Sequence, residues 1–335
     1  MVLACGIIAS FSMAPRSFSL DAPALPTGLW KVMKQVLWAV MLSCTLAGRA
    51  SGATEMAVTI DDLPTHGALP KGTQRTAIAE RIISILKRHA VPEVYGFVNG
   101  GQIRETPDHM DILRMWVEAG LRVGNHTFAH PNLNHVSAAD YIGDIERNEA
   151  MLVEVAGPLW GRVFRYPYLH EGDTLQKRRA VRRWLAAQGY QIAQVTVYFD
   201  DWAWNDAYAR CVGRPDPGAI QWLKHSFLQS AMQRLEWSEA VSKAVLGRHI
   251  KQILLLHLGA FDAVMLDELL TAYRQAGVTM IGLTEAMADP VYKLDPDIVW
   301  DGELIFLLQV ARARKLPPIP PAPAIPLRKL SAVCR

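Results

Sequence analysis

The sequence has few cysteines, and they do not follow the pattern of a metal site. Among its 335 residues are Cys5, Cys44, Cys211 and Cys334, with no Cys-x-x-Cys pair. A cysteine-ligated zinc site, in which thiolates recur at short spacings, is therefore not expected. Cys211 and Cys334 could pair in an oxidising compartment, but sequence alone does not bring their Cα atoms within bridging distance.

The chain also lacks a strong excess of charge of either sign. It has 35 Lys and Arg residues against 32 Asp and Glu, a formal net charge of +3. A nucleic-acid-binding protein needs a concentrated basic face, so we expect no nucleic acid among the partners. Half of the residues are hydrophobic and 20% are charged, as in globular proteins, and the length allows one large domain or two small ones.

No apolar run near the N-terminus is long enough to span a bilayer comfortably, which takes about 20 residues. Met33-Lys34 precedes an apolar run from Val36 to Ala47, and Ser51-Gly52-Ala53 follows it. This order predicts a secretory signal peptide over residues 33–53. We therefore expect a secreted, periplasmic or cell-envelope protein without a stable membrane span. Residues 1–32 fit poorly, and our hypothesis is that they are a mis-annotated extension; an uncleaved signal anchor or an amphiphilic tail is the alternative.

From residue 56 onward, short apolar runs alternate with longer helical patterns. Residues 56–60, 94–98, 191–197 and 253–256 predict strands, whereas the apolar stripe within residues 74–89 predicts an amphipathic helix. Repeated β-then-α units imply a parallel sheet or a barrel. Residues 202–250 are long, Trp-rich and mostly helical, and we expect an insertion over one end of the sheet. Residues 316–326 contain six prolines and predict an extended, poorly packed tail.

Residues that carry chemistry follow several of these predicted strands. Asp61-Asp62 ends the first one, where two adjacent carboxylates are costly unless they bind something; a polar turn is the alternative. His126 and His130 are four residues apart, so both imidazoles can reach one metal ion from one side of a helical turn. One carboxylate and two neutral imidazoles form a common open site for a catalytic divalent metal.

Three more polar positions follow later strands. Arg165 can hold a carboxylate through a bidentate hydrogen-bonded pair. Asp200-Asp201 is a second carboxylate pair, and His257 follows the apolar run 253–256. A lone histidine in such a place is more often a satisfied core residue. Because sites in parallel α/β proteins form at the carboxyl ends of strands, we expect all these positions to belong to one site.

The five motifs, in this order, resemble those of the polysaccharide deacetylase family, with its NodB homology domain (carbohydrate esterase family 4). The matching segments are Thr59-Ile60-Asp61-Asp62, His126-Thr127-Phe128-Ala129-His130-Pro131, Arg165-Tyr166-Pro167-Tyr168, Asp201-Trp202 and Leu255-Leu256-His257. The resemblance covers residues 54–290 and implies an α/β fold, a distorted (β/α) barrel of about seven strands. Residues 291–335 would then be a C-terminal extension that contains the Pro-rich tail.

The resemblance also implies a reaction and a role for each residue. The reaction is hydrolysis of a carbon–nitrogen bond, removing N-acetyl groups from a peptidoglycan- or chitin-like polysaccharide or oligosaccharide. The implied cofactor is a divalent metal ion, Zn²⁺ first, with Co²⁺ or Ni²⁺ as alternatives. The implied roles are catalytic base for Asp61, metal ligands for Asp62, His126 and His130, holder of the base for Arg165, catalytic acid for His257, orienting carboxylate for Asp201, and oxyanion stabilisation by the backbone N–H of Tyr168.

Two departures from the family's motifs leave parts of this assignment open. The family often has another Asp three residues before the Asp-Trp aspartate, and Tyr198 stands there instead. Either Asp200 or Asp201 could therefore orient His257. No glycine directly follows Tyr168, so the oxyanion loop can differ from that of the family.

Other functions are compatible with the same residues. An O-acetyl esterase or a non-sugar amidase could use this site unchanged. A non-catalytic carbohydrate-binding protein is an alternative of a different class, with tryptophans stacking on sugar rings. The tryptophans in question are Trp202, Trp204, Trp222 and Trp237, although such residues in a helical segment more often belong to the core.

Overall fold

The fold is described from a computed structural model, which defines residues 54–335 except residues 215 and 301–304. The predicted signal peptide (33–53) and the N-terminal extension (1–32) lie outside these residues. Within the described ranges, no helix combines the length and the apolar composition needed to cross a membrane. The strands are β1 (Glu55–Leu63), β2 (Tyr95–Val98), β3 (Arg122–Asn125), β4 (Trp160–Phe164), β5 (Gln191–Ile192), β6 (Gln252–His257) and β7 (Thr279–Ile281).

Helices follow most strands, as the alternating pattern predicts. They are α2 (Arg75–Arg88), α3 (Gly100–Ile103), α4 (Pro107–Glu118), α5 (Ala138–Ala156), α6 (Leu175–Ala187), α7 (Ala203–Gly213), α8 (Pro217–Leu246), α9 (Ala260–Gln275), α10 (Leu283–Met287), α11 (Phe306–Ala313) and α12 (Leu327–Ala332). Short 3-10 turns occur at Gly157–Leu159, Pro167–Leu169 and Pro290–Lys293. The apolar stripe of α2 is buried as expected, and α5 begins at Ser137, whose side chain accepts a hydrogen bond from the backbone N–H of Asp140.

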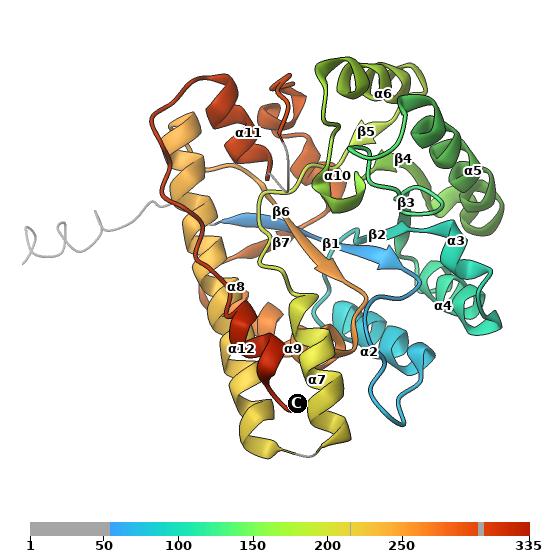
Figure 1. Cartoon of the computed structure of the whole chain (residues 1–335), viewed down its shortest axis with the longest axis vertical. Coiled ribbons are helices and arrows are strands. Elements are labelled where there is room, and N and C mark those ends of the chain that lie inside the picture. The colour runs from blue at the N-terminus through green and yellow to red at the C-terminus, as the bar shows by residue number, and fades with distance from the viewer. Residues whose placement is uncertain (1–53, 215, 301–304) are drawn as a thin grey trace, which may run out of the picture. The chain divides into compact units, whose positions relative to one another are not determined.

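The strands of the described chain form one parallel sheet in the order β5-β4-β3-β2-β1-β6, with β7 paired to the first residues of β1 (Figure 1). After β5 the chain runs on to Val197, which bridges Leu254 of β6. The two ends of the sheet therefore meet through an irregular segment, and the predicted distorted (β/α) barrel is confirmed. The expected strand over 191–197 is regular only at Gln191–Ile192.

Alternation along β1 divides the core into an inner and an outer part. Met56, Val58 and Ile60 pack in the large cluster that includes the apolar residues of α2, α4 and α9. Ala57 points the other way, into a smaller cluster with Tyr95, Phe97 and residues of the other strands. Since successive side chains of a strand point to opposite faces, both faces of this sheet are buried. This double burial fixes the register of β1 and hence the position of its carboxyl end.

The C-terminal tail is extended as predicted, and none of residues 316–326 is buried, but it is held against the protein. Helices α7 and α8 fill the predicted insertion, and the Pro-rich segment runs along α8 (Figure 1). Arg234 donates a hydrogen bond to the carbonyl oxygen of Pro323 (3.1 Å), and the Trp237 indole donates to that of Pro320 (2.9 Å). Cys211 and Cys334 form a disulfide, with Cα atoms 5.1 Å apart. Prolines lack N–H groups but keep their carbonyls, so side chains of α8 can hold an extended tail.

Candidate active site

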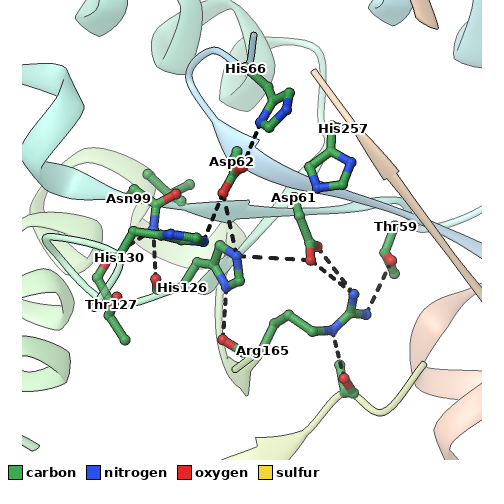
Figure 2. Close-up of polar contacts among 12 residues, drawn as sticks. Thr59, Asp61, Asp62, His66, Asn99, His126, Thr127, His130, Arg165 and His257 are labelled. Carbon is green, nitrogen blue, oxygen red and sulfur yellow. Dashed lines mark hydrogen bonds and ion pairs between the residues drawn. The ribbon is translucent and has the colours of Figure 1, made fainter. Parts of the chain in front are cut away.

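The residues predicted for the site meet at the carboxyl ends of the strands (Figure 2). Asp61 of β1 is in register with His257 of β6, while His126 directly follows β3 and Arg165 directly follows β4. A cavity of about 360 Å³ lies there, and its lining includes Asp61, Asp62, His126, His130, Tyr168 and His257. Arg165 and Asp201 are buried beside it. The structure thus brings together every residue that the sequence motifs singled out.

Asp62, His126 and His130 form a group that can hold a metal ion. Asp62 Oδ1 lies 3.4 Å from His126 Nε2 and 3.3 Å from His130 Nε2. Two ligand atoms about 2.1 Å from a tetrahedral ion are themselves about 3.4 Å apart, so these separations fit a shared ion. Asp62 Oδ1 is buried and has no hydrogen-bond partner among the described residues. A cation bound by this group would give the buried carboxylate oxygen the partner that the protein does not supply.

The protonation states of this group also suit metal binding. Burial alone would raise the pKa of Asp62, but the neighbouring imidazoles of His126, His66 and His130 hold it well below its usual range. Burial, and next the neighbouring His126, lower the pKa of His130 to about 4. His126 Nδ1 donates to the carbonyl oxygen of Arg165 (2.8 Å), which leaves Nε2 as the free acceptor. The group therefore offers one ionised carboxylate, the neutral imidazole of His130 and the Nε2 atom of His126.

Asp61 stands beside this group and is held by Arg165. One guanidinium nitrogen of Arg165 lies 3.2 Å from each carboxylate oxygen of Asp61, and another donates to the Thr59 hydroxyl (3.1 Å). Asp61 Oδ2 is 3.9 Å from His126 Nε2. Because Asp61 has its own cationic partner, its carboxylate stays separate from the Asp62 group while facing the same cavity.

His257 faces the cavity from β6 and is paired with Asp201. Its Nδ1 lies 2.9 Å from Asp201 Oδ1, and its backbone N–H donates to Asp201 Oδ2 (2.7 Å). Burial would lower the pKa of His257, but the carboxylate of Asp201 raises it to about 10, so the imidazole is protonated at neutral pH. His257 donates both hydrogen bonds to Asp201 and none to Asp200. Of the two carboxylates that the sequence left as possible partners of His257, Asp201 is therefore the one in contact.

Tyr168 and the tryptophans occupy different surroundings. Tyr168 has φ 57°, is 47% exposed, and packs its ring edge-on against His130 at 4.5 Å between centroids.

Of the four tryptophans considered as surfaces for sugar stacking, Trp202 alone lines the cavity. Trp204 is fully buried in the core, and Trp237 on α8 contacts the tail. Most of these tryptophans thus belong to packing rather than to the site.

Two residues of this region were not expected from the sequence. His66 lines the cavity, and its Nδ1 lies 2.7 Å from Asp62 Oδ2. Asp262, at the start of α9, is buried beside Asp201; burial first, and then the charge of Asp201, raise its pKa well above the usual range. The signal for His66 was its spacing of four residues after Asp62. Asp262 gave no signal, because it lies inside the first turn of α9 and not at the end of a strand.

Together the fold and the site define a β/α hydrolase with a metal-capable Asp–His–His group. Comparison with known proteins agrees with this class. The family model for polysaccharide deacetylase matches residues 48–192. Over residues 48–192 the chain is therefore similar to the polysaccharide deacetylase family.

Individual relatives are distant. The chain is 27% identical over 219 residues to a peptidoglycan-N-acetylglucosamine deacetylase of Bacillus cereus, covering 64% of this chain and 70% of the relative. It is 30% identical over 131 residues to a chitin deacetylase of Colletotrichum lindemuthianum, covering 38% and 45%. The solved structure of a chitin deacetylase from that fungus gives a TM-score of 0.49 at 22% identity, covering 71% of this chain and 89% of the other.

Proposed function

We propose that this protein is a metal-dependent hydrolase that removes N-acetyl groups from an amino-sugar polysaccharide of the peptidoglycan or chitin kind. The observation that carries the proposal is that Asp61 and His257, neighbours in register on β1 and β6, line the same cavity as the Asp62–His126–His130 group. A base and a protonated acid facing one reacting carbon is what amide hydrolysis requires.

Each of the proposed catalytic residues acts at a particular step of the reaction. Asp61, held by Arg165, takes the proton of the attacking water as the water oxygen bonds to the acetyl carbonyl carbon. The backbone N–H of Tyr168 helps to stabilise the oxyanion that forms. His257, protonated and oriented by Asp201, gives its proton to the sugar nitrogen as the carbon–nitrogen bond breaks. The products are acetate and a free amine.

Asp62, His126 and His130 are the proposed ligands of the metal. A bound divalent ion there would supply Lewis-acid stabilisation of the oxyanion and lower the pKa of the attacking water. Nitrogen and carboxylate ligands in this number suit Zn²⁺, with Co²⁺ or Ni²⁺ as workable substitutes. The substrate class follows the names of the relatives, which are a peptidoglycan and a chitin deacetylase.

We also propose that the protein works outside the cytoplasm, in the periplasm, the cell envelope or the medium. The Cys211–Cys334 disulfide supports this location, since such bonds persist mainly in oxidising compartments. An amino-sugar polymer of the cell wall would be accessible there.

The experiment that tests the function is acetate release from three substrates: chitin oligomers, peptidoglycan and acetyl xylan. The proposal predicts release from an amino-sugar polymer, its loss on treatment with a chelator, and its return with Zn²⁺. Release from acetyl xylan alone would make the protein an O-acetyl esterase instead. Binding to the polymers without release of acetate would favour the non-catalytic carbohydrate-binding function.

A further inference from the structure

His66 makes a short contact with one of the proposed metal ligands. Its Nδ1 lies 2.7 Å from Asp62 Oδ2, and the side chain is 24% exposed, at the wall of the cavity. Figure 2 shows it on the side of Asp62 away from His126 and His130. A carboxylate oxygen can only accept, so Nδ1 carries the proton of this hydrogen bond. No motif of the sequence assigned a role to this residue.

The contact divides the two oxygens of Asp62 between two tasks. Oδ2 accepts from His66, whereas Oδ1 faces His126 Nε2 and His130 Nε2 at 3.4 and 3.3 Å. Without a donor on Oδ2, the carboxylate could rotate about its last bond and exchange its oxygens. A hydrogen bond to one oxygen thus fixes which lone pairs point at the ion, as outer partners do for other ligating carboxylates.

The loop that carries His66 is itself tied down at several points. The backbone N–H of His66 donates to the carbonyl oxygen of Leu258 (3.1 Å), next to His257. Arg75 of α2 donates to the hydroxyl of Thr65 and to the carbonyl oxygen of Gly67. The rings of His66 and His257 lie 4.5 Å apart. The imidazole of His66 is therefore preorganised against Asp62 rather than free to sample other positions.

His66 could instead be a metal ligand, because Asp62, His66 and His257 also form a group of possible ligand atoms. Its geometry argues against that role. Two atoms bound to one tetrahedral ion lie about 3.4 Å apart, as Asp62 Oδ1 and the His126 and His130 nitrogens do. The His66–Asp62 separation of 2.7 Å is that of a direct hydrogen bond, with no room for an ion between the atoms.

We propose that His66 is a positioning residue, which fixes Asp62 for metal binding through the Nδ1–Oδ2 hydrogen bond. The inference rests on the proposed function, in that it takes Asp62, His126 and His130 as the metal ligands. It assigns no contact between His66 and the reacting atoms. Its consequence is measurable as metal affinity, independently of any deacetylation.

The test is a competition titration of the metal-free protein with Zn²⁺ against a chromophoric chelator, for three variants of His66. Asn places its amide N–H close to the position of Nδ1, whereas Gln places it near that of Nε2. His66→Ala and His66→Gln should weaken Zn²⁺ binding roughly 10- to 100-fold, the usual effect of losing such an outer partner, and His66→Asn should recover most of the loss. The control is His225→Ala, an exposed histidine on α8, which should bind as the unaltered protein does.

Substitution of Zn²⁺ by Co²⁺ separates positioning from ligation. If His66 only orients Asp62, the Co²⁺ absorption spectrum of saturated His66→Gln keeps the shape of the unaltered protein. A changed spectrum, a second bound equivalent of metal, or equal Zn²⁺ affinity in all three variants overturns the inference. Absence of Zn²⁺ binding by the unaltered protein would instead remove the proposed function, so the two failures are distinguishable. Thermal melting of the metal-free variants checks that each is folded, and His66→Gln serves if His66→Ala is not.

Discussion

Replacing Arg165 by Met should destabilise the protein far more than the loss of a surface arginine. Arg165 is 1% exposed and donates to both oxygens of Asp61, to Thr59 and to the carbonyl oxygen of Ala193 (2.7 Å). Its guanidinium also lies 4.6 Å from the centroid of the Phe97 ring. Met keeps much of the volume and removes every donor. The carboxylate of Asp61 would then be buried without its cation.

Breaking a buried pair by removing one partner costs about 3–5 kcal/mol of the free energy of unfolding. At about 2–4 °C per kcal/mol for a domain of this size, the melting temperature should fall by roughly 10 °C. Urea denaturation followed by tryptophan fluorescence measures the free energy directly. In the double variant Asp61→Asn/Arg165→Met no charge is left unpaired, so its cost should be at least about 1 kcal/mol below the sum of the single costs.

The matched control is Arg88→Met, which removes an arginine from an exposed ion pair with Asp267. Exposed pairs are worth about 0–1 kcal/mol, so this variant should stay close to the unaltered protein. If Arg165→Met costs no more than Arg88→Met, or if the Asp61 and Arg165 costs simply add, the pair does not hold the site as we have reasoned.

Three further results are expected. Asp61→Asn should abolish acetate release while bound metal, measured by elemental analysis, persists; loss of the metal would mean that Asp61 is a ligand rather than the base. His257 must be protonated to act, and activity should fall as pH rises through its raised pKa of about 10. Asp201→Asn removes the carboxylate that raises the pKa of His257. The alkaline limb of the pH profile of kcat should therefore move down by about 1–3 pH units, and an unmoved limb would show that Asp201 does not set the pKa of the acid. Replacing Cys211 and Cys334 together by Ala should lower the free energy of unfolding by about 2–5 kcal/mol in urea titrations, and an unchanged midpoint and slope would show that the bond is dispensable.

The sequence predicted the strand ends well because two strong regularities coincide there. A strand buried on both faces is a continuous apolar run, and the first polar residue after it marks the edge where sites form. His257 follows this rule directly, since it ends the apolar run 253–256, while Asp61, His126 and Arg165 lie at or directly after the ends of β1, β3 and β4. Their convergence follows from the parallel order of the strands, in which Asp61 and His257 share a register position.

What the sequence did not predict depends on contacts without a periodic signal. His66 reaches Asp62 across an irregular turn, so neither a helical nor a strand pattern marks it. The choice between Asp200 and Asp201 depends on the path of the chain after β5, where regular pairing is lost. The anchoring of the tail depends on carbonyls of Pro320 and Pro323 that meet α8 from about 80 residues further along the chain.

Arg165 contacts Asp61 through its side chain and His126 through its backbone. Its guanidinium holds Asp61, while its carbonyl oxygen accepts from His126 Nδ1. Any substitution at this position changes the first contact, but every amino acid keeps the second, because the carbonyl belongs to the backbone. A variant that lost the Arg165 side chain would therefore still hold His126 toward Asp62, while Asp61 lost its guanidinium partner. Substitutions at this one position thus separate the support of Asp61 from the orientation of His126.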